Sequence, residues 1–259
     1  MGGPRRRGRL RTAAAVIVYG RNPVREALHG RRKHSVREIW ATGGAAREPW
    51  LEGQAVKTVA AEEIERHSGS AAHQGLCAEV GPYPYSGAAE LLALQSPVIV
   101  ALDQVQDPQN LGSICRTAEC VGVAGVVIPE RRAAEITPAV CKASAGAVEH
   151  LRVARVRNLA DFLAEARRAG CWCYGASAEE GTGGERPVPY DEPDYGDGGV
   201  VLVLGSEGSG LRPRVAGACD QLIALPLLGR VESLGVSAAA SALLYEILQS
   251  RAGKLDNGS

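Results

Sequence analysis

The stretch "VIVALDQVQDPQNLGSICRTAEC", residues 98–120, passes from an apolar run to a helical pattern across one short loop. The run at 98–103 has no alternation of polar side chains, which is typical of a strand covered on both faces. Residues 111–122 repeat apolar side chains at helical spacing. A strand followed directly by a helix is the repeating unit of a parallel sheet, so this stretch predicts an α/β fold.

The same alternation continues to the end of the chain. The strands that the pattern predicts lie at 98–103, 124–129, 150–156, 171–177, 200–205 and 221–227, and the clearest helices at 111–122, 159–170 and 236–251. Continuous apolar strands separated by helices indicate a mostly parallel sheet with helices on both faces. In such sheets ligands bind beyond the C-terminal ends of the strands. The polar, acidic segment 179–199 is predicted to be a surface loop.

A smaller α/β unit is predicted before this sheet. Its expected strands are 16–20, 36–42 and 75–80, and its expected helices are 22–30, with Asn22 as cap and Gly30 as stop, and 60–68. The predicted organisation is therefore a basic tail at 1–15, this unit at 16–80, a linker at 81–96 that begins with a Pro- and Gly-rich run, and the larger domain at 97–254.

Charge is unevenly distributed along the 259 residues, although the net charge is zero. Residues 1–40 carry eleven Lys or Arg against two Glu, a balance of +9, and the remainder carries −9. A basic segment on a neutral protein indicates a polyanionic partner, nucleic acid first, with Arg5, Arg6 and Arg7 as candidate contacts. A tail that only aids solubility would have the same composition.

The cysteines and apolar runs exclude several protein classes. The seven cysteines are an odd number without a CxxC pair, so we expect a reduced, cytoplasmic protein with buried thiols and no metal. The apolar runs are far shorter than the roughly 20 residues of a membrane span. The Arg-rich start lacks the apolar core of a signal peptide, and a transit peptide remains an alternative.

The first of three candidate ligand segments is 103–122, a loop and the helix that follows it. Asn110 is placed to cap the following helix, and Arg116 lies four residues after Gly112 on the same helical face. Because helical side chains lean toward the N-terminus, we expect the guanidinium of Arg116 to extend over Gly112 toward the positive end of the helix. This arrangement predicts a phosphate site, with a capped helix and an exposed arginine as the alternative.

The second loop follows the strand at 200–205 and reads Gly205-Ser206-Glu207-Gly208-Ser209-Gly210. Glycines at this position let the backbone approach a ligand closely. Their spacing fits neither a dinucleotide fingerprint nor a P-loop. Glu207 is a candidate to bind a ligand or to fix a neighbouring loop.

The third loop lies in "LPLLGRVESLGVSAAASALLYEIL", residues 225–248, where a short apolar strand becomes an alanine-rich helix. Either Ser233 or Ser237 could cap that helix. A cap does not explain Gly235 between them, so we expect this junction to be both a helix start and part of a ligand site.

Together the three loops resemble the three motifs of the SpoU-type RNA ribose 2′-O-methyltransferases. The first resembles N-x-G-x-x-x-R, the second G-N-E-G-x-G, and 225–237 resembles I-P-M-x-G-x-x-x-S-L-N-V-S. In addition, 18–28 and 73–80 resemble the small RNA-binding domain of the branch that modifies guanosine in 23S ribosomal RNA. The segment 142–153 resembles the sequence between the family's motifs.

The resemblance implies a parallel sheet of the SPOUT type with a C-terminal trefoil knot, and an N-terminal domain with a ribosomal-protein-like RNA-binding fold. It implies S-adenosylmethionine bound in the knot and a homodimer whose two subunits share the RNA site. The cofactor contacts that it implies are Gly205, Leu225 and Leu234, with Ser233 and Ser237 beside them. The RNA contacts are Arg21, Asn22 and Arg116, in addition to the basic tail.

The implied reaction moves a methyl group from the sulfonium to a ribose 2′-hydroxyl, with Arg116, Asn110 and Glu207 as catalytic candidates. Because arginine stays protonated at neutral pH, we expect Arg116 to anchor phosphate and stabilise the developing oxyanion rather than act as a base. Ser206 and Gly235 stand where the family has Asn. Gly235 can keep the backbone turn while deleting an amide.

Three alternatives remain open at this point. The substrate could be a guanosine of tRNA or an adenosine of ribosomal RNA. The chain could also be an RNA-binding assembly factor whose catalysis is weakened by Gly235.

Overall fold

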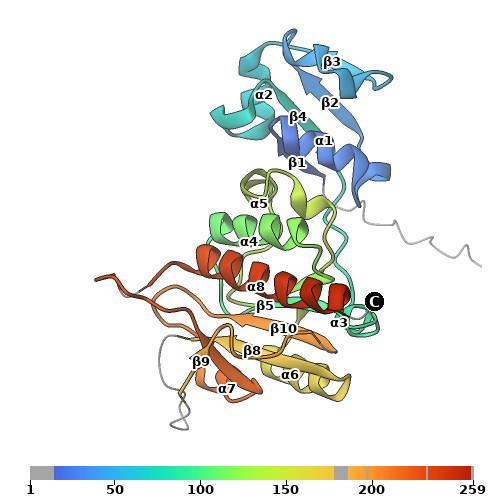
Figure 1. Ribbon diagram of the computed structural model, residues 1–259. Coiled ribbons are helices and arrows are strands. Elements are labelled where there is room, and N and C mark those ends of the chain that lie inside the picture. The colour runs from blue at the N-terminus through green and yellow to red at the C-terminus, as the bar shows by residue number, and fades with distance from the viewer. Residues whose placement is uncertain (1–14, 178–185, 197, 232, 258–259) are drawn as a thin grey trace, which may run out of the picture.

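The computed structural model describes residues 15–177, 186–196, 198–231 and 233–257 (Figure 1). The N-terminal unit is a four-stranded sheet in the order β1-β4-β2-β3. Its elements are β1 (Val16–Tyr19), α1 (Arg21–His29), β2 (Glu38–Ala41), β3 (Val56–Thr58), α2 (Ala61–Ser68) and β4 (Leu76–Val80). The predicted strands and helices of this unit are confirmed, whereas the short, exposed β3 was not predicted.

The start of α1 differs from the sequence prediction. The helix begins at Arg21, and Gly20, with φ 97°, occupies the capping position. Asn22 therefore lies within the first turn and does not cap the helix. A residue at positive φ is best supplied by glycine, which explains why the chain turns into the helix at Gly20.

The larger unit is a seven-stranded sheet in the order β7-β6-β5-β10-β8-β11-β9, and all its pairings are parallel. Its strands are β5 (Val98–Leu102), β6 (Gly125–Pro129), β7 (Val153–Val156), β8 (Cys171–Ala176), β9 (Val188–Pro189), β10 (Gly199–Leu204) and β11 (Gln221–Ala224). The predicted parallel sheet is confirmed. The two-residue β9 lies in the segment that was predicted to be a loop.

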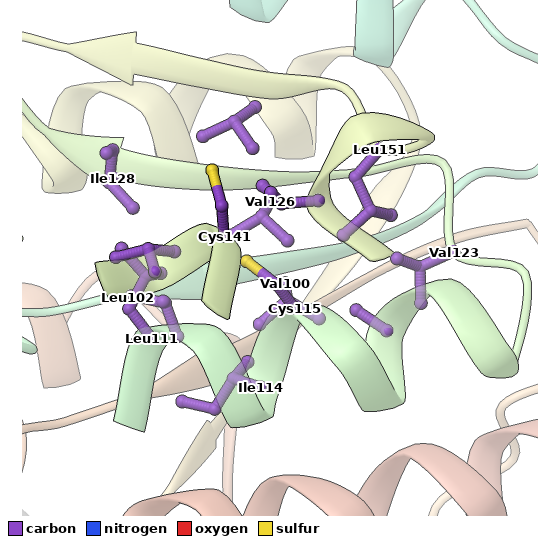
Figure 2. Close-up of a cluster of buried hydrophobic side chains, with 14 of the residues drawn as sticks. Val100, Leu102, Leu111, Ile114, Cys115, Val123, Val126, Ile128, Cys141 and Leu151 are labelled. Carbon is purple, nitrogen blue, oxygen red and sulfur yellow. The ribbon is translucent and has the colours of Figure 1, made fainter. Parts of the chain in front are cut away.

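Helices cover both faces of this sheet. They are α3 (Ala88–Leu92), α4 (Pro108–Cys120), α5 (Pro138–Ala143), α6 (Leu159–Arg168), α7 (Pro213–Ala216) and α8 (Val236–Asn257), of which α3, α5 and α7 were not predicted. Val100 packs on one face among residues of α4 and α5 (Figure 2). Leu202 and the buried residues of α8 belong to the same cluster. Ile99 and Val201 pack on the other face against α6. Burial on both sides explains why these strands are apolar throughout.

The strand order sets the place of the ligand site. From β5 the chain moves outward through β6 and β7, then returns so that β10 pairs with β5 on its other side. The loops that follow β5 and β10 therefore leave the sheet side by side at the C-terminal edge. Such a reversal of strand order is where α/β sheets bind ligands.

Buried contacts join the two units. Arg32 and Glu149 are both buried; Nε of Arg32 donates to Oε2 of Glu149 at 2.9 Å, and Nη2 donates to Oε1. A Cβ on Gly30 would lie 2.5 Å from the carbonyl oxygen of Glu149, so the backbones pack directly. Segment 81–96 is packed as well, because Leu91 is buried and the Tyr83 hydroxyl donates to the Leu151 carbonyl at 2.7 Å.

Candidate active site

A cleft of about 310 Å³ lies at the C-terminal edge of the sheet, and we call it the strand-end cleft. It is lined by Gln104, Val105, Gln106, Asp107, Asn110, Ser206, Glu207, Ser209 and Val236. Residues from all three candidate loops thus converge: Asn110 from the first, Glu207 from the second and Val236 from the third. Oε1 of Glu207 also lies 3.6 Å from the position that a Cβ on Gly235 would take.

The glycine-rich loop after β10 closes on itself. The backbone groups of Ser206 and Gly210 exchange two hydrogen bonds, of 3.2 and 3.0 Å. A Cβ on Gly205 would lie 2.2 Å from the Gly210 carbonyl, so no other residue fits this tight turn. The loop's own backbone therefore occupies the space on the Cβ side of Gly205, and the contact between the Gly205 backbone and a ligand stays a prediction. Glu207 is presented at the tip of this turn.

A buried carboxylate, which sequence reasoning missed, ties the first two loops together. Asp103 follows β5, is fully buried, and accepts hydrogen bonds from the Arg212 backbone amide at 2.9 Å and from Nε of Arg212 at 2.8 Å. Arg212 directly precedes α7 at the end of the glycine-rich loop. The sequence did contain a signal for this contact: an acidic residue ends one apolar strand, and a basic residue follows the loop after another apolar strand.

The start of α4 also differs from the prediction. The side chain of Asp107 caps the helix by accepting from the Gln109 amide at 3.1 Å, so Asn110 is not the cap. Asn110 instead lies in the first helical turn and lines the strand-end cleft. Gln104, at the other side of the cleft, has φ 61°. A non-glycine residue in this conformation stores strain of roughly 1–3 kcal/mol, as is common near functional sites.

The third loop contains the predicted turn at Gly235, which has φ 83°. Ser233 Oγ accepts a hydrogen bond from the Gly235 amide at 3.1 Å, and α8 begins at Val236. Ser237 therefore lies inside the helix, and Ser233 supports the turn, so neither serine has the predicted capping role. Leu228 and Leu234 are 98% and 52% exposed beside this turn, whereas Leu225 packs against the core.

Arg116 lies on a different face of α4 from Asn110. Six residues turn an α-helix by about 600°, which is about 240° beyond one full turn, so the two side chains point in different directions. The prediction that Arg116 extends over Gly112 is wrong, because a Cβ on Gly112 would lie 2.4 Å from Cβ of Ala143 and the helices α4 and α5 pack there. A single chain thus does not bring Arg116 together with Asn110 and Glu207.

Arg116 lines a second cleft of about 330 Å³, which we call the interdomain cleft. Its lining residues come from both units: Asn22, Arg25 and Glu26 from α1, and Arg116, Glu119, Cys120, Ser144, Ala145, Ala147 and His150 from the larger domain. Of the predicted RNA contacts, Asn22 therefore lies here with Arg116. Arg21 is exposed nearby and pairs with Glu48 at 2.8 Å. Arg5, Arg6 and Arg7 lie outside the described residues.

The thiols are mostly buried, as predicted, and only Cys120 of the seven is exposed. Burial raises the pKa of Cys115 and of Cys141 to about 12. No group of three or more His, Cys, Asp or Glu side chains is placed to hold a metal within the described ranges. No helix in the same ranges is long and apolar enough to cross a membrane.

The sequence profile of the SpoU rRNA methylase family matches residues 97–245, which is more than half of the chain. The chain belongs to this family. A second profile, described as RNA 2′-O ribose methyltransferase substrate binding, matches residues 17–86, the N-terminal unit. As a member of this family the chain is a methyltransferase, and the family's cofactor is S-adenosylmethionine.

Individual relatives align over almost the whole chain. A TrmH family tRNA/rRNA methyltransferase of Bacillus subtilis, YacO, is 38% identical over 90% of this chain and 95% of its own length. Another TrmH family tRNA/rRNA methyltransferase, from Staphylococcus haemolyticus, is 36% identical over 93% of this chain and 98% of its own. The crystal structure of an AdoMet-bound rRNA methyltransferase from Sinorhizobium meliloti is 25% identical, with a TM-score of 0.75, over 91% of this chain and 87% of that one.

The residues around the strand-end cleft fit this cofactor. The glycine-rich loop and the turn at Gly235 expose backbone groups that can bind its polar parts. Leu228 and Leu234 present exposed apolar side chains on the loop that leads into α8.

Proposed function

We propose that this SpoU-family enzyme methylates the ribose 2′-hydroxyl of a guanosine in 23S ribosomal RNA. The single observation that carries the proposal is the convergence of Asn110, Glu207 and the Gly235 turn at one cleft, in a chain whose family modifies RNA. The N-terminal unit, which matches the substrate-binding profile, and the +9 balance of residues 1–40 support an RNA substrate.

We place S-adenosylmethionine against Gly205, Leu225 and Leu234, with Ser233 and Ser237 beside it. The backbone of the Gly205 turn and of the Leu225 loop would hold the polar groups, and Leu234 would cover the adenine. When bound, the cofactor supplies an electrophilic methyl group on its sulfonium. We also propose that residues 225–257 form the family's trefoil knot, which an experimental trace of this segment would test.

Side chains of the protein position the ribose 2′-hydroxyl that accepts the methyl group. Arg116 anchors the target phosphate and stabilises the charge that develops on the 2′-oxygen, because a fixed guanidinium in a cleft acts on charge as it appears. Glu207 orients Asn110 or the ribose, which keeps the 2′-oxygen in line with the methyl carbon and the sulfur. The hydroxyl proton leaves to the RNA phosphate or to water.

We infer a homodimer, because Arg116 and the strand-end cleft are separated within one chain. In our proposal Arg116 of one subunit reaches the strand-end cleft of the other. The exposed apolar side chains Tyr245 and Leu248 lie on α8, which packs against α4, and they support an interface at this helix. An exposed apolar face of this kind commonly marks a protein contact.

Transfer of labelled methyl from S-adenosylmethionine to unmodified 23S ribosomal RNA and tRNA transcripts tests the function. We expect label on 23S RNA, and nuclease digestion to yield 2′-O-methylguanosine. Label on tRNA, or on adenosine, would overturn the proposed substrate but not the reaction. RNA binding without any transfer would contradict the reaction itself and favour an assembly factor.

A further inference from the structure

The interdomain cleft contains charged groups that the anchoring of one phosphate by Arg116 does not require. Arg25 donates from Nε to Oε1 of Glu26 at 2.7 Å, and Oε2 of Glu26 lies 2.8 Å from Nε2 of His150 across the domain boundary. Burial opposes ionisation of Glu26, but hydrogen bonds with His150 and Arg25 outweigh it and lower its pKa. Glu26 therefore stays ionised and holds Arg25 in place.

The wall of the cleft is also fixed by packing. A Cβ on Gly146 would lie 2.7 Å from Cγ of Glu26, so α1 and the turn after α5 touch directly. The buried Arg32–Glu149 pair lies in the same domain contact. Since Arg25 is carried by one unit and Arg116 by the other, this contact sets the geometry between the two guanidinium groups. Glu26 engages Nε and Nη2 of Arg25, which leaves Nη1 of Arg25 and the guanidinium of Arg116 to donate to a phosphate in the cleft.

We propose that the interdomain cleft holds one nucleotide of single-stranded RNA, with its phosphate bound by Arg25 and Arg116 and its base directed to Glu119. This inference rests on the RNA substrate of the proposed function. The cleft's volume of about 330 Å³ falls in the range of small-ligand sites, roughly 300–1,000 Å³. Bases are read in this way when RNA is unpaired, because their Watson–Crick edges are then free.

The carboxylate of Glu119 argues against a site that binds only phosphate. It lies one turn after Arg116 on α4, is half-buried, and has no ion pair within the described part of the chain. A carboxylate repels a phosphate, but it accepts hydrogen bonds from base amino groups such as N4 of cytosine. The pairing of Arg116 with Glu119 thus matches a nucleotide, which presents a phosphate and a base together.

Cys120 provides a direct test, because it is exposed in the cleft and the other six thiols are not. We expect a short oligo(C) RNA to slow alkylation of Cys120 by iodoacetamide several-fold near neutral pH, measured by mass spectrometry. Fluorescence anisotropy on the same samples reports whether RNA is bound. Bound RNA with unchanged Cys120 reactivity would overturn the inference. Failure of the wild type to bind any RNA would overturn the proposed function and this inference with it.

Arg25→Gln has a matched control in Arg37→Gln. Both arginines belong to the N-terminal unit, are 46% and 45% exposed, and pair with a glutamate, but Arg37 does not line the cleft. We expect Arg25→Gln to weaken RNA binding about 10-fold, to lower the salt slope by about 0.7, and to abolish protection of Cys120. Arg37→Gln should change none of these, and equal effects of the two variants would contradict the proposal.

Glu119→Gln tests the base contact by the sign of its effect. If Glu119 faces only phosphates, removing its charge tightens binding of every RNA equally. If it accepts from base amino groups, the variant weakens binding of oligo(C) relative to oligo(U), whose bases carry no amino group. We expect the second result, and an equal change for both RNAs would overturn the role of Glu119.

Discussion

The strand-end cleft and the interdomain cleft lie on different faces of α4 and are built in different ways. The strand-end cleft is shaped by backbone: a glycine turn at Gly205 that tolerates no side chain, and a second turn at Gly235 with positive φ. The interdomain cleft is shaped by charged side chains from two units, among them Arg25, Glu26 and Arg116. Because the two clefts are built from different groups, we expect that the proposed cofactor and RNA sites can be disturbed separately.

The two clefts also depend on different ion pairs, each with a buried carboxylate. Asp103 and Arg212 connect the loops around the strand-end cleft. Arg32 and Glu149 connect the two units beside the interdomain cleft. Mutations in either pair should therefore affect one ligand and spare the other, and the predictions below use this separation, from the largest expected effect to the smallest.

Arg116→Ala should lower methyl transfer about 1,000-fold while cofactor binding stays nearly unchanged. The loss corresponds to about 4 kcal/mol, the upper value for removing one group that stabilises an oxyanion. Single-turnover transfer of labelled methyl and calorimetric titration of the cofactor measure the two effects. Full activity of Arg116→Ala would refute the assigned role, and a parallel loss of cofactor affinity would show that the two clefts are not independent.

Glu149→Gln should destabilise the protein by about 3–5 kcal/mol, because it leaves the charge of Arg32 buried without a partner. Denaturant unfolding measures the change. Glu38→Gln is the control, since its pair with Lys57 is exposed and should contribute less than about 1 kcal/mol. Below the unfolding transition, RNA binding should weaken more than cofactor binding, and the reverse order would contradict the division between the clefts.

Asp103→Asn should lower cofactor affinity about 10-fold and leave RNA affinity unchanged. The substitution removes a charge-assisted contact worth about 1.5–3 kcal/mol between β5 and the glycine-rich loop. Part of this loss in free energy is offset by water, because the Arg212 side chain is 45% exposed and can be solvated. Equilibrium titrations of both ligands check the prediction, which an unchanged cofactor affinity would contradict.

Gly235→Asn should have the smallest effect, changing cofactor affinity by less than about two-fold, since Asn tolerates positive φ. Its Cβ would lie 3.6 Å from Oε1 of Glu207, an ordinary contact. The new amide could then donate to Glu207, so we expect the change in kcat/KM for RNA rather than in cofactor affinity. A large gain in cofactor affinity would show that the loop is impaired in the natural sequence.

The parallel sheet could be predicted because its strands are apolar throughout and separated by helical segments. Short elements such as β3 and β9 lack such a pattern and were missed. The three loops were identified from their residues, and their position at one edge follows from parallel strands. The direction of Arg116 could not be predicted, because it depends on how α5 packs on Gly112. Likewise, Asp103 meets Arg212 only because β10 inserts beside β5.

The central claim is that one active site takes Arg116 from one subunit and the strand-end cleft from the other. Mixed dimers test it most directly, made by co-expressing an Arg116→Ala chain with a Gly205→Val chain whose glycine turn cannot close. Each variant alone should form inactive dimers. The mixed dimer should recover up to about half of wild-type activity, because one of its two sites then has neither lesion. A mixed dimer that binds cofactor but shows no recovered transfer would contradict the claim.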